Sequence, residues 1–200
     1  MFHLVESICI ERKVLHHIDL HNKRFNKARK KLFNADDWIN LDDFIIITEN
    51  LNDSRYKCRV STSNGKNLKV EIVPYIQRKI ETIKLIEVND IDYSIKTDQR
   101  ELLNSAYDKR GNCDDIIIVK NNCITDSWAA NVILFDGKHW VTPNTPLLEG
   151  VQREYLLSTQ RIITKRIYRK DLHFYQKIKL INALVDFERA PTIEIGKIEG

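Results

Sequence analysis

One carboxylate in the second half of the sequence, Asp126, lies in a pattern that suggests a ligand site. Residues 120–140 are expected to form a strand, a tight turn, a second strand that carries Asp126, a loop of small residues and a third strand. An Asp136-Gly137 pair then indicates a hairpin turn. An acid held under a loop of small side chains can face a ligand, and the alternative is an ordinary aspartate that caps a turn.

Two further places offer cationic side chains. Lys96 lies between a short run at 93–95 and an expected helix, and a lysine amine in a partly apolar pocket loses its proton readily and can form a Schiff base. The alternative is a solvated surface lysine. His21 and Arg24 are three residues apart and share one face of an expected helix, where a guanidinium can bind a phosphate. The alternative for this pair is an ordinary helix surface.

A glycine before an expected helix offers a different type of binding group. Gly150 is followed by Val151 and Gln152, which begin the helix. The first backbone N–H groups of a helix lack partners and lie at the positive end of its dipole, so they suit a phosphate. The alternative is a simple turn. No metal site is expected, because the adjacent pair His16-His17 cannot face one ion from a regular element.

The composition is that of a folded chain without a strong charge bias. Its 200 residues are 42% hydrophobic with a net charge of +4, which suits one large domain or two small ones and excludes a disordered chain. No apolar run reaches the roughly 20 residues that cross a bilayer, and no secretory signal is visible, so we expect no membrane partner. The four scattered cysteines suit reduced thiols in the cytoplasm.

Much of the positive charge is concentrated in one expected helix. A nucleic-acid patch is one interpretation of this cluster, and the solvated face of an amphipathic helix is the interpretation that we favour. We therefore expect no nucleic-acid partner. The cluster consists of Lys23, Arg24, Lys27, Arg29, Lys30 and Lys31.

The elements that must position these groups predict an α+β protein with two domains. The first domain, residues 1–88, combines strands and helices, and the second, residues 89–200, is dominated by strands that can wrap into a barrel-like sheet. The elements expected in the first domain are a strand at 4–10, helices at 19–33 and 42–51, a hairpin of 56–61 and 68–74, and a strand at 83–87. Those expected in the second are helices at 98–109 and 151–157, strands at 115–119, 161–167 and 177–181, and a short helix from Asp171.

The order and spacing of these motifs resemble the class-IV aminotransferases, fold-type IV enzymes that use pyridoxal 5'-phosphate (PLP). The resemblance covers nearly the whole chain, and the sequence looks most like the aminodeoxychorismate lyases, relatives of the D-amino-acid and branched-chain aminotransferases. Its last two blocks are the most specific. The blocks are Leu4-Val5-Glu6-Ser7-Ile8, Leu20-His21-Asn22-Lys23-Arg24, Ile95-Lys96, Asp114 to Val119, Ile124-Thr125-Asp126-Ser127 through Asn131-Val132, and Thr142-Pro143 through Leu147-Leu148-Glu149-Gly150-Val151-Gln152-Arg153.

The resemblance implies a role for each of the residues singled out above. Lys96 would be the Schiff-base lysine, and Arg24 would bind the cofactor phosphate together with backbone groups of Val151 and Gln152. Asp126 would face the pyridine nitrogen and keep it protonated, which lets the ring accept electrons from the substrate. The other cofactor-binding residues expected are Asn131 and Gly150.

Two positions depart from the family pattern. The family usually has a glutamate at the place of Asp126, so direct contact with the ring nitrogen requires a shifted ring or an intervening water. It usually has a small hydroxyl residue at the place of Gln152, and the residue type needed for that side-chain contact with the phosphate is therefore missing.

The same resemblance implies a function. The expected reaction converts 4-amino-4-deoxychorismate to 4-aminobenzoate and pyruvate for folate synthesis, in a cytoplasmic homodimer that acts on small amino-bearing molecules. The alternative is an aminotransferase of branched-chain or D-amino acids, because both reactions begin with abstraction of the same proton. Arg59 would pair with a substrate carboxylate or form a structural salt bridge. The non-enzyme alternatives are a family member with impaired catalysis and a binding module that uses the basic helix.

Overall fold

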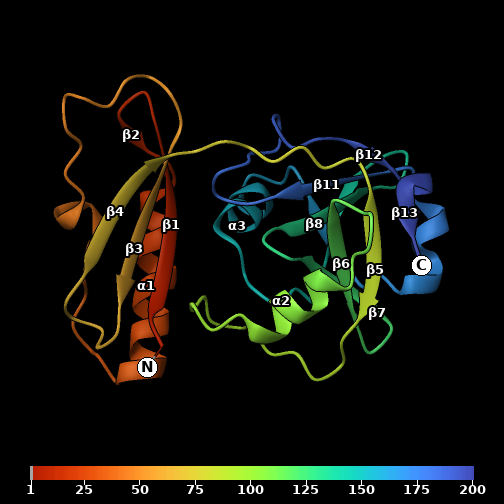
Figure 1. Ribbon diagram of the computed structural model, residues 1–200, viewed down its shortest axis with the longest axis horizontal. Coiled ribbons are helices and arrows are strands. Elements are labelled where there is room, and N and C mark those ends of the chain that lie inside the picture. Colours follow the sequence, from red (N-terminus) through yellow and green to blue (C-terminus); the bar gives the residue numbers. More distant parts are fainter. Residues whose placement is uncertain (1) are drawn as a thin grey trace. The chain divides into compact units, whose positions relative to one another are not determined.

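The computed structural model describes residues 2–200 as two compact units. The first unit runs to Gln77 and includes the short segment Ile95–Gln99, whereas the second comprises Arg78–Ser94 and Arg100–Gly200. Figure 1 shows the chain coloured along its sequence. The sequence predicted a single domain boundary, between residues 88 and 89. This boundary stays a prediction, because compact units are not the same as independently folding domains.

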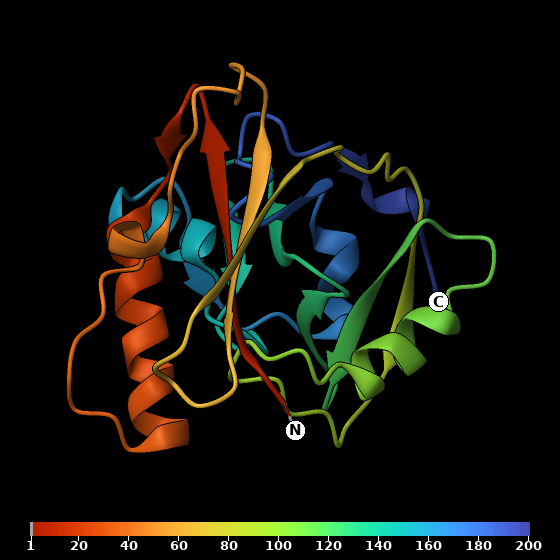
Figure 2. The same ribbon diagram turned by 60° about the vertical axis from the view of Figure 1, so that its left-hand side comes forward.

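The first unit is a four-stranded sheet with one long helix along one face. The sheet has the order β2-β1-β3-β4, and β1 pairs antiparallel with both β2 and β3. Figure 2 shows α1 running alongside the strands of this sheet. Alternate residues of β1, which include Leu4, Ile8 and Ile10, pack against Phe25 and Ala28 of the helix. The elements are β1 (Leu4–Glu11), β2 (Val14–Leu15), α1 (Ile18–Phe33), the 3₁₀ helix η1 (Leu41–Phe44), β3 (Tyr56–Thr62) and β4 (Lys69–Pro74).

The inner face of α1 is more polar than its sequence pattern predicts. Arg29 belongs to the basic cluster that was expected to face solvent, but its side chain is fully buried. Its guanidinium donates to the backbone oxygens of Gly65 and Asp37 at 2.6 and 2.9 Å, and to Asn26 Oδ1 at 2.9 Å. Arg29 therefore joins the helix to the turn between β3 and β4, and the cluster is not one solvated face.

The prediction of a helix at residues 42–51 is wrong, because only the short 3₁₀ helix η1 forms there. Two buried asparagines of α1 bind the backbone just before it. Asn26 accepts from Ile39 N–H at 3.0 Å and donates to Ile39 O at 2.8 Å, and Asn22 accepts from Leu41 N–H at 2.8 Å. Side-chain amides thus hold the backbone at residues 39 and 41, where the chain enters η1.

Replacing Arg29 with methionine is expected to lower the free energy of unfolding by about 3 kcal/mol, because the carbonyls of Gly65 and Asp37 lose their donors. Denaturant unfolding measures the change. Lys30→Met is the matched control, since its ion pair with Asp36 is exposed and contributes little. Equal effects of the two substitutions would show that Arg29 does not anchor the turn.

The second unit is built on a larger, strand-dominated sheet, which fits the expected α+β fold. The main path through this sheet has the order β10-β9-β8-β7-β6-β5-β13, with β11 beside β8 and β12 beside β11. No helix within residues 2–200 is long and apolar enough to cross a bilayer. The elements are β5 (Ile83–Glu87), α2 (Glu101–Asp108), β6 (Asp115–Lys120), β7 (Cys123–Ser127), β8 (Asn131–Phe135), β9 (Trp140–Pro143), α3 (Val151–Ser158), β10 (Ile163–Lys165), the 3₁₀ helices η2 (Arg169–Phe174) and η3 (Ile195–Lys197), β11 (Lys177–Ile181), β12 (Ile193–Glu194) and β13 (Ile198–Glu199).

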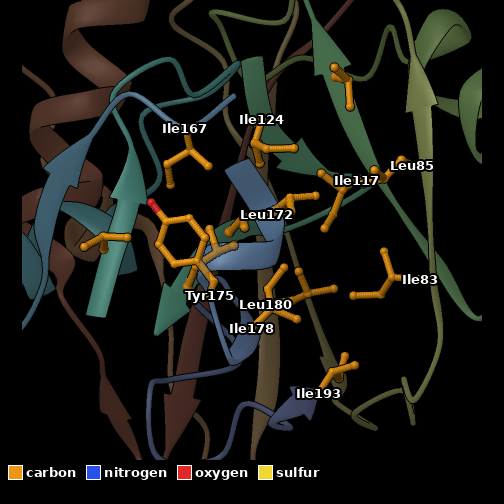
Figure 3. Packing of buried hydrophobic residues seen from close by; sticks show 14 residues of the cluster. Ile83, Leu85, Ile117, Ile124, Ile167, Leu172, Tyr175, Ile178, Leu180 and Ile193 are labelled. Carbon is orange, nitrogen blue, oxygen red and sulfur yellow. The ribbon is translucent and has the colours of Figure 1, made fainter. Parts of the chain in front are cut away.

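One large apolar cluster fills the second unit. Figure 3 shows Leu172 of η2 and the adjacent Tyr175 among side chains from several strands, including Ile117, Ile124 and Ile178. The connection between β10 and β11 therefore supplies part of the core. Side chains from several strands of the sheet contribute to this one cluster. Their close packing therefore fixes the positions of these strands relative to one another.

The strand β8 lies at a fork in this sheet. One of its edges pairs with β11 along its whole length. Its other pairings are divided, because Asn131 pairs with Asp126 of β7, whereas Leu134 and Phe135 pair with β9. Thr142 Oγ1 donates to Val132 O at 2.9 Å near the point of division. A fork of this kind brings side chains of β7, β8 and the segment after β9 together.

Candidate functional site

Asp126 is buried at the fork and its carboxylate accepts three hydrogen bonds. Oδ1 accepts from Asn131 Nδ2 at 2.8 Å, and Oδ2 accepts from the backbone N–H groups of Leu147 and Leu148 at 2.9 Å each. A carboxylate has about four acceptor positions, so one remains on Oδ1. This arrangement goes beyond a turn cap, because the bonded N–H groups lie some twenty residues further along the chain.

The surroundings of Asp126 place its titration close to neutral pH. Burial raises the pKa of Asp126 to about 6, although the hydrogen bonds from Leu148, Asn131 and Leu147 and the charge of Arg153 act in the opposite direction. At pH 7 most molecules therefore carry an ionised Asp126, ready to accept a further hydrogen bond from a cationic N–H group.

Gly150 is required at its position because Asn131 approaches it closely. A Cβ atom at residue 150 would lie 1.9 Å from Asn131 Oδ1. The backbone conformation of Gly150 is one that other residues adopt, with φ −75°, so the constraint is one of space. Asn131 also donates to Leu148 O at 2.9 Å. Its amide thus links Asp126 to the segment that precedes α3.

Replacing Gly150 with alanine is expected to displace the Asn131 amide and to reduce the free energy of unfolding by about 2 kcal/mol. Gly196→Ala is the control, because a Cβ there meets nothing within 4 Å in the described part of the chain. Thermal and denaturant unfolding compare the two variants. If Gly150→Ala matches Gly196→Ala, the close approach to Asn131 has no energetic consequence.

The N-terminus of α3 is held in place but carries no cap of its own. Gly150 precedes Val151, and within the described residues no side chain caps the helix start. Buried Arg153 donates from Nε to Thr142 Oγ1 at 3.2 Å and from Nη2 to Pro143 O at 3.0 Å. The first backbone N–H groups of α3 are therefore positioned to bind an anion, and Val151 and Gln152 lie in this first turn.

A second group of functional side chains lies inside the first unit. Glu6 of β1 accepts from Arg24 Nε at 2.8 Å and from Arg24 Nη2 at 2.6 Å, and His21 Nδ1 lies 2.6 Å from Glu6 Oε2. Burial raises the pKa of Glu6, but the charge of Arg24 and the contacts with His21 outweigh burial and lower this pKa to about 2. Glu6 is thus a carboxylate, and it fixes the orientation of both α1 side chains.

Lys96 is tied to the same strand through its backbone. Its carbonyl oxygen accepts from Val5 N–H at 2.9 Å, and Leu4 forms an antiparallel bridge with Thr97. Burial lowers the pKa of His21, and the charges of Arg24 and Lys96 lower it further against the effect of Glu6. Lys96 therefore lies beside the Glu6 group, close enough for its charge to act on His21.

The expected site residues thus fall into two groups. Asp126, Asn131 and Gly150 are in contact at the start of α3, where Val151 and Gln152 follow, whereas Arg24 and Lys96 belong to the first unit. Arg59 is partly buried on β3, opposite Ser7 and Glu71, and no ion-pair partner lies within 4 Å of it among residues 2–200.

Sequence reasoning assigned no role to Glu6 or Arg153. Glu6 carried a signal, because it interrupts a row of apolar residues, Leu4, Ile8 and Ile10, that alternates along β1. An acid in such a row needs a cationic partner from the element packed against it. Arg153 carried no comparable signal, and neither did the backbone N–H groups of Leu147 and Leu148.

The first unit is small and α+β, and it holds a lysine on an anchored backbone. The second is dominated by strands and holds a buried acid beside the start of a helix. These features are those of a fold-type IV PLP enzyme. The chain belongs to the class IV aminotransferase family, whose sequence pattern, described as amino-transferase class IV, it matches over residues 3–189. This family is PLP-dependent, so the resemblance inferred from the motifs, the enzyme class and the cofactor are confirmed.

Three similar proteins illustrate this membership. An uncharacterized protein of Haemophilus influenzae is 34% identical over 186 residues, which are 92% of this chain and 98% of that protein. The crystal structure of a proposed 4-amino-4-deoxychorismate lyase from Haemophilus somnus has a TM-score of 0.85 at 31% identity, covering 92% of this chain and 97% of that one. The branched-chain amino acid aminotransferase of Escherichia coli has a TM-score of 0.74 at 13% identity, covers 99% of this chain and 77% of that one, and shares the fold.

The residues of this chain fit PLP at three points. The first turn of α3, which no side chain caps among residues 2–200, suits a phosphate. The buried carboxylate of Asp126 retains one acceptor position for a pyridinium N–H group. Arg24 supplies a guanidinium bound to Glu6, and Lys96 supplies an amine from a segment whose backbone is bonded to Val5.

Proposed function

We propose that this PLP enzyme is an aminodeoxychorismate lyase, which converts 4-amino-4-deoxychorismate to 4-aminobenzoate and pyruvate for folate synthesis. The observation that carries this choice is the likeness to the proposed lyase of Haemophilus somnus, at 31% identity over 97% of that chain. That protein is matched almost from end to end, so its similarity extends beyond a shared core.

Five groups of this chain have proposed roles in holding the cofactor. Lys96 attaches PLP through Nζ, and Arg24 and the first turn of α3 bind its phosphate. The same guanidinium donates from Nε and Nη2 to Glu6, which orients it. Asp126 accepts a hydrogen bond from the ring nitrogen and keeps that nitrogen protonated. Asn131 holds Asp126 in place.

When bound, PLP accepts the electron pair that remains after the substrate C–H bond next to the amino group breaks. Lys96, once its amine is released, would take the proton from that carbon. The C–O bond at the neighbouring carbon would then break, and the enolpyruvyl group would leave, gain a proton to become pyruvate and leave an aromatic ring. Arg59 is proposed to pair with a substrate carboxylate, since no structural ion pair engages it among residues 2–200. We further propose that the enzyme is a cytoplasmic homodimer.

An aminotransferase of branched-chain or D-amino acids is the second candidate, favoured by the family match over residues 3–189. In that reaction the amino group would pass to a keto acid, and no pyruvate would be eliminated. The early steps use the same groups of Lys96 and Asp126. The two candidates therefore differ in product and not in the residues that begin the reaction.

The deciding experiment supplies the purified protein and PLP with 4-amino-4-deoxychorismate and follows pyruvate by coupled NADH oxidation with lactate dehydrogenase. Pyruvate and 4-aminobenzoate in equal amounts are expected. A parallel assay with pairs of amino and keto acids follows exchange of the amino group. Exchange without pyruvate release would replace the lyase by an aminotransferase, and the absence of both products would contradict both candidates.

A further inference from the structure

The imidazole of His21 has one nitrogen whose partner is missing from the described structure. Its side chain is fully buried, and Nδ1 lies 2.6 Å from Glu6 Oε2. Nε2 is buried and has no hydrogen-bond partner among residues 2–200. A buried polar atom without a partner costs free energy, so a donor or acceptor supplied in the working enzyme is expected at this point.

The partner of Nε2 must be a hydrogen-bond donor. Glu6 is ionised, since its pKa is about 2, and therefore accepts the hydrogen bond from Nδ1–H. Burial, Arg24 and Lys96 lower the pKa of His21, so the ring is neutral near pH 7. In a neutral imidazole that donates from Nδ1, the other nitrogen carries a lone pair and acts as an acceptor.

Three charged groups face His21 from the elements around it: Glu6 on β1, Arg24 on α1 itself and Lys96 on the segment 95–99. Arg24 directs Nε and Nη2 to Glu6. The Lys96 backbone is fixed beside β1 by the bond to Val5 N–H, next to Glu6 in the chain. Lys96 is therefore the cation whose flexible side chain can bring a donor to Nε2.

We propose that His21 is a positioning residue for Lys96, with Nε2 accepting a hydrogen bond from the Lys96 amine and Glu6 holding the ring in the tautomer that permits it. This proposal rests on the role proposed above for Lys96. When the amine is not attached to the cofactor, His21 holds Nζ in one place. A neutral ring does this without the repulsion that a second cation would exert.

Two substitutions separate the two nitrogens of His21. His21→Asn places an amide near the position of Nδ1, where it can still donate to Glu6, and leaves nothing at Nε2. His21→Gln reaches the position of Nε2 and can present its oxygen there as an acceptor. A purely structural role for the bond to Glu6 would be preserved by asparagine, whereas the proposed role would be preserved by glutamine.

The measurement uses the protein without PLP, so it is independent of catalysis. Brief reductive methylation with formaldehyde and cyanoborohydride labels neutral amines, and mass spectrometry of peptides gives the pH at which half of Lys96 reacts. Because an acceptor at Nε2 stabilises the ammonium form, His21→Asn is expected to lower this midpoint by about half a pH unit, a roughly threefold change in the ratio of neutral to charged amine. His21→Gln is expected to leave it unchanged. Exposed Lys138 in the same digests is the internal control.

An unchanged Lys96 midpoint in His21→Asn would overturn the proposal, and equal shifts in both variants would also overturn it, since these would report a change in packing. Failure here is distinguishable from failure of the proposed function. The midpoint of Lys96 is measured without cofactor or substrate, whereas the lyase assay depends on both.

Discussion

Replacing Lys96 with alanine is expected to abolish turnover, with a loss of at least about 10⁴-fold. The reason is that one amine is proposed both to attach the cofactor and to move the substrate proton. The same variant should lack the absorbance band near the violet edge of the visible spectrum that the unaltered protein shows with PLP. Absorbance and steady-state pyruvate release measure the two effects.

Lys138→Ala is the matched control for this substitution, because Lys138 is an exposed lysine in the turn between β8 and β9. It should retain both the band and full turnover. Borohydride reduction followed by peptide mapping should place the cofactor on Lys96 in the control. A Lys96→Ala protein that keeps its colour, with the label on another lysine, would assign the attachment point elsewhere.

Asp126→Asn is expected to lower kcat by about 100- to 1,000-fold while cofactor attachment at Lys96 persists. An amide cannot hold a positive charge on a ring nitrogen as a carboxylate does. The amide can still accept the N–H groups of Leu147 and Leu148 through its oxygen, so the local fold should survive. Turnover and the absorbance band, measured on one sample, separate catalysis from attachment, and an unchanged kcat would exclude Asp126 as the group that charges the ring.

The raised pKa of Asp126 predicts how activity depends on pH. Activity of the unaltered enzyme should fall as pH decreases through about 6, where the carboxylate becomes protonated, and Asp126→Asn should lack this change. The contribution of Asp126 to folding stability changes with pH in the opposite direction to activity. The folded state holds this proton more tightly than the unfolded chain, so the contribution of Asp126 to stability is greatest below about pH 4 and is lost as pH rises through about 6.

The difference in unfolding free energy between Asp126→Asn and the unaltered protein should therefore move by roughly 2 kcal/mol in favour of the variant between pH 4 and pH 7. Urea unfolding at both pH values measures this difference. A difference that does not change with pH would mean that the carboxyl group of Asp126 titrates in the folded protein as it does in the unfolded chain.

The sequence predicted those elements whose pattern agrees with their environment. The strand at 83–87 and the helix that begins at Val151 were both predicted. The first has a local apolar pattern that is typical of a strand, and the second follows a glycine that marks the start of a helix. The strand expected at 161–167 is confined to Ile163–Lys165. Positions set by local pattern were therefore predictable, and the ends of elements were less so.

The parts that could not be predicted depend on polar contacts between distant residues. Arg29 looks like any surface arginine of a basic helix until Gly65 O and Asp37 are brought to it. Asn22 and Asn26 bind the backbone at residues 39 and 41 through contacts that periodicity does not encode. At the candidate site, Asp126 and Asn131 were found from a motif, whereas their link to Leu148 required the folded chain.

The hydrogen bonds to Asp126 from residues 147 and 148 come from the backbone and not from side chains. Substitutions at these two positions can therefore change the size and polarity of the local surface while leaving the acid where it is. We expect residues 147 and 148 to tolerate substitutions that Asn131 and Gly150 do not. Selection for a new substrate can therefore act at these positions while the buried carboxylate of Asp126 and its hydrogen bonds stay in place.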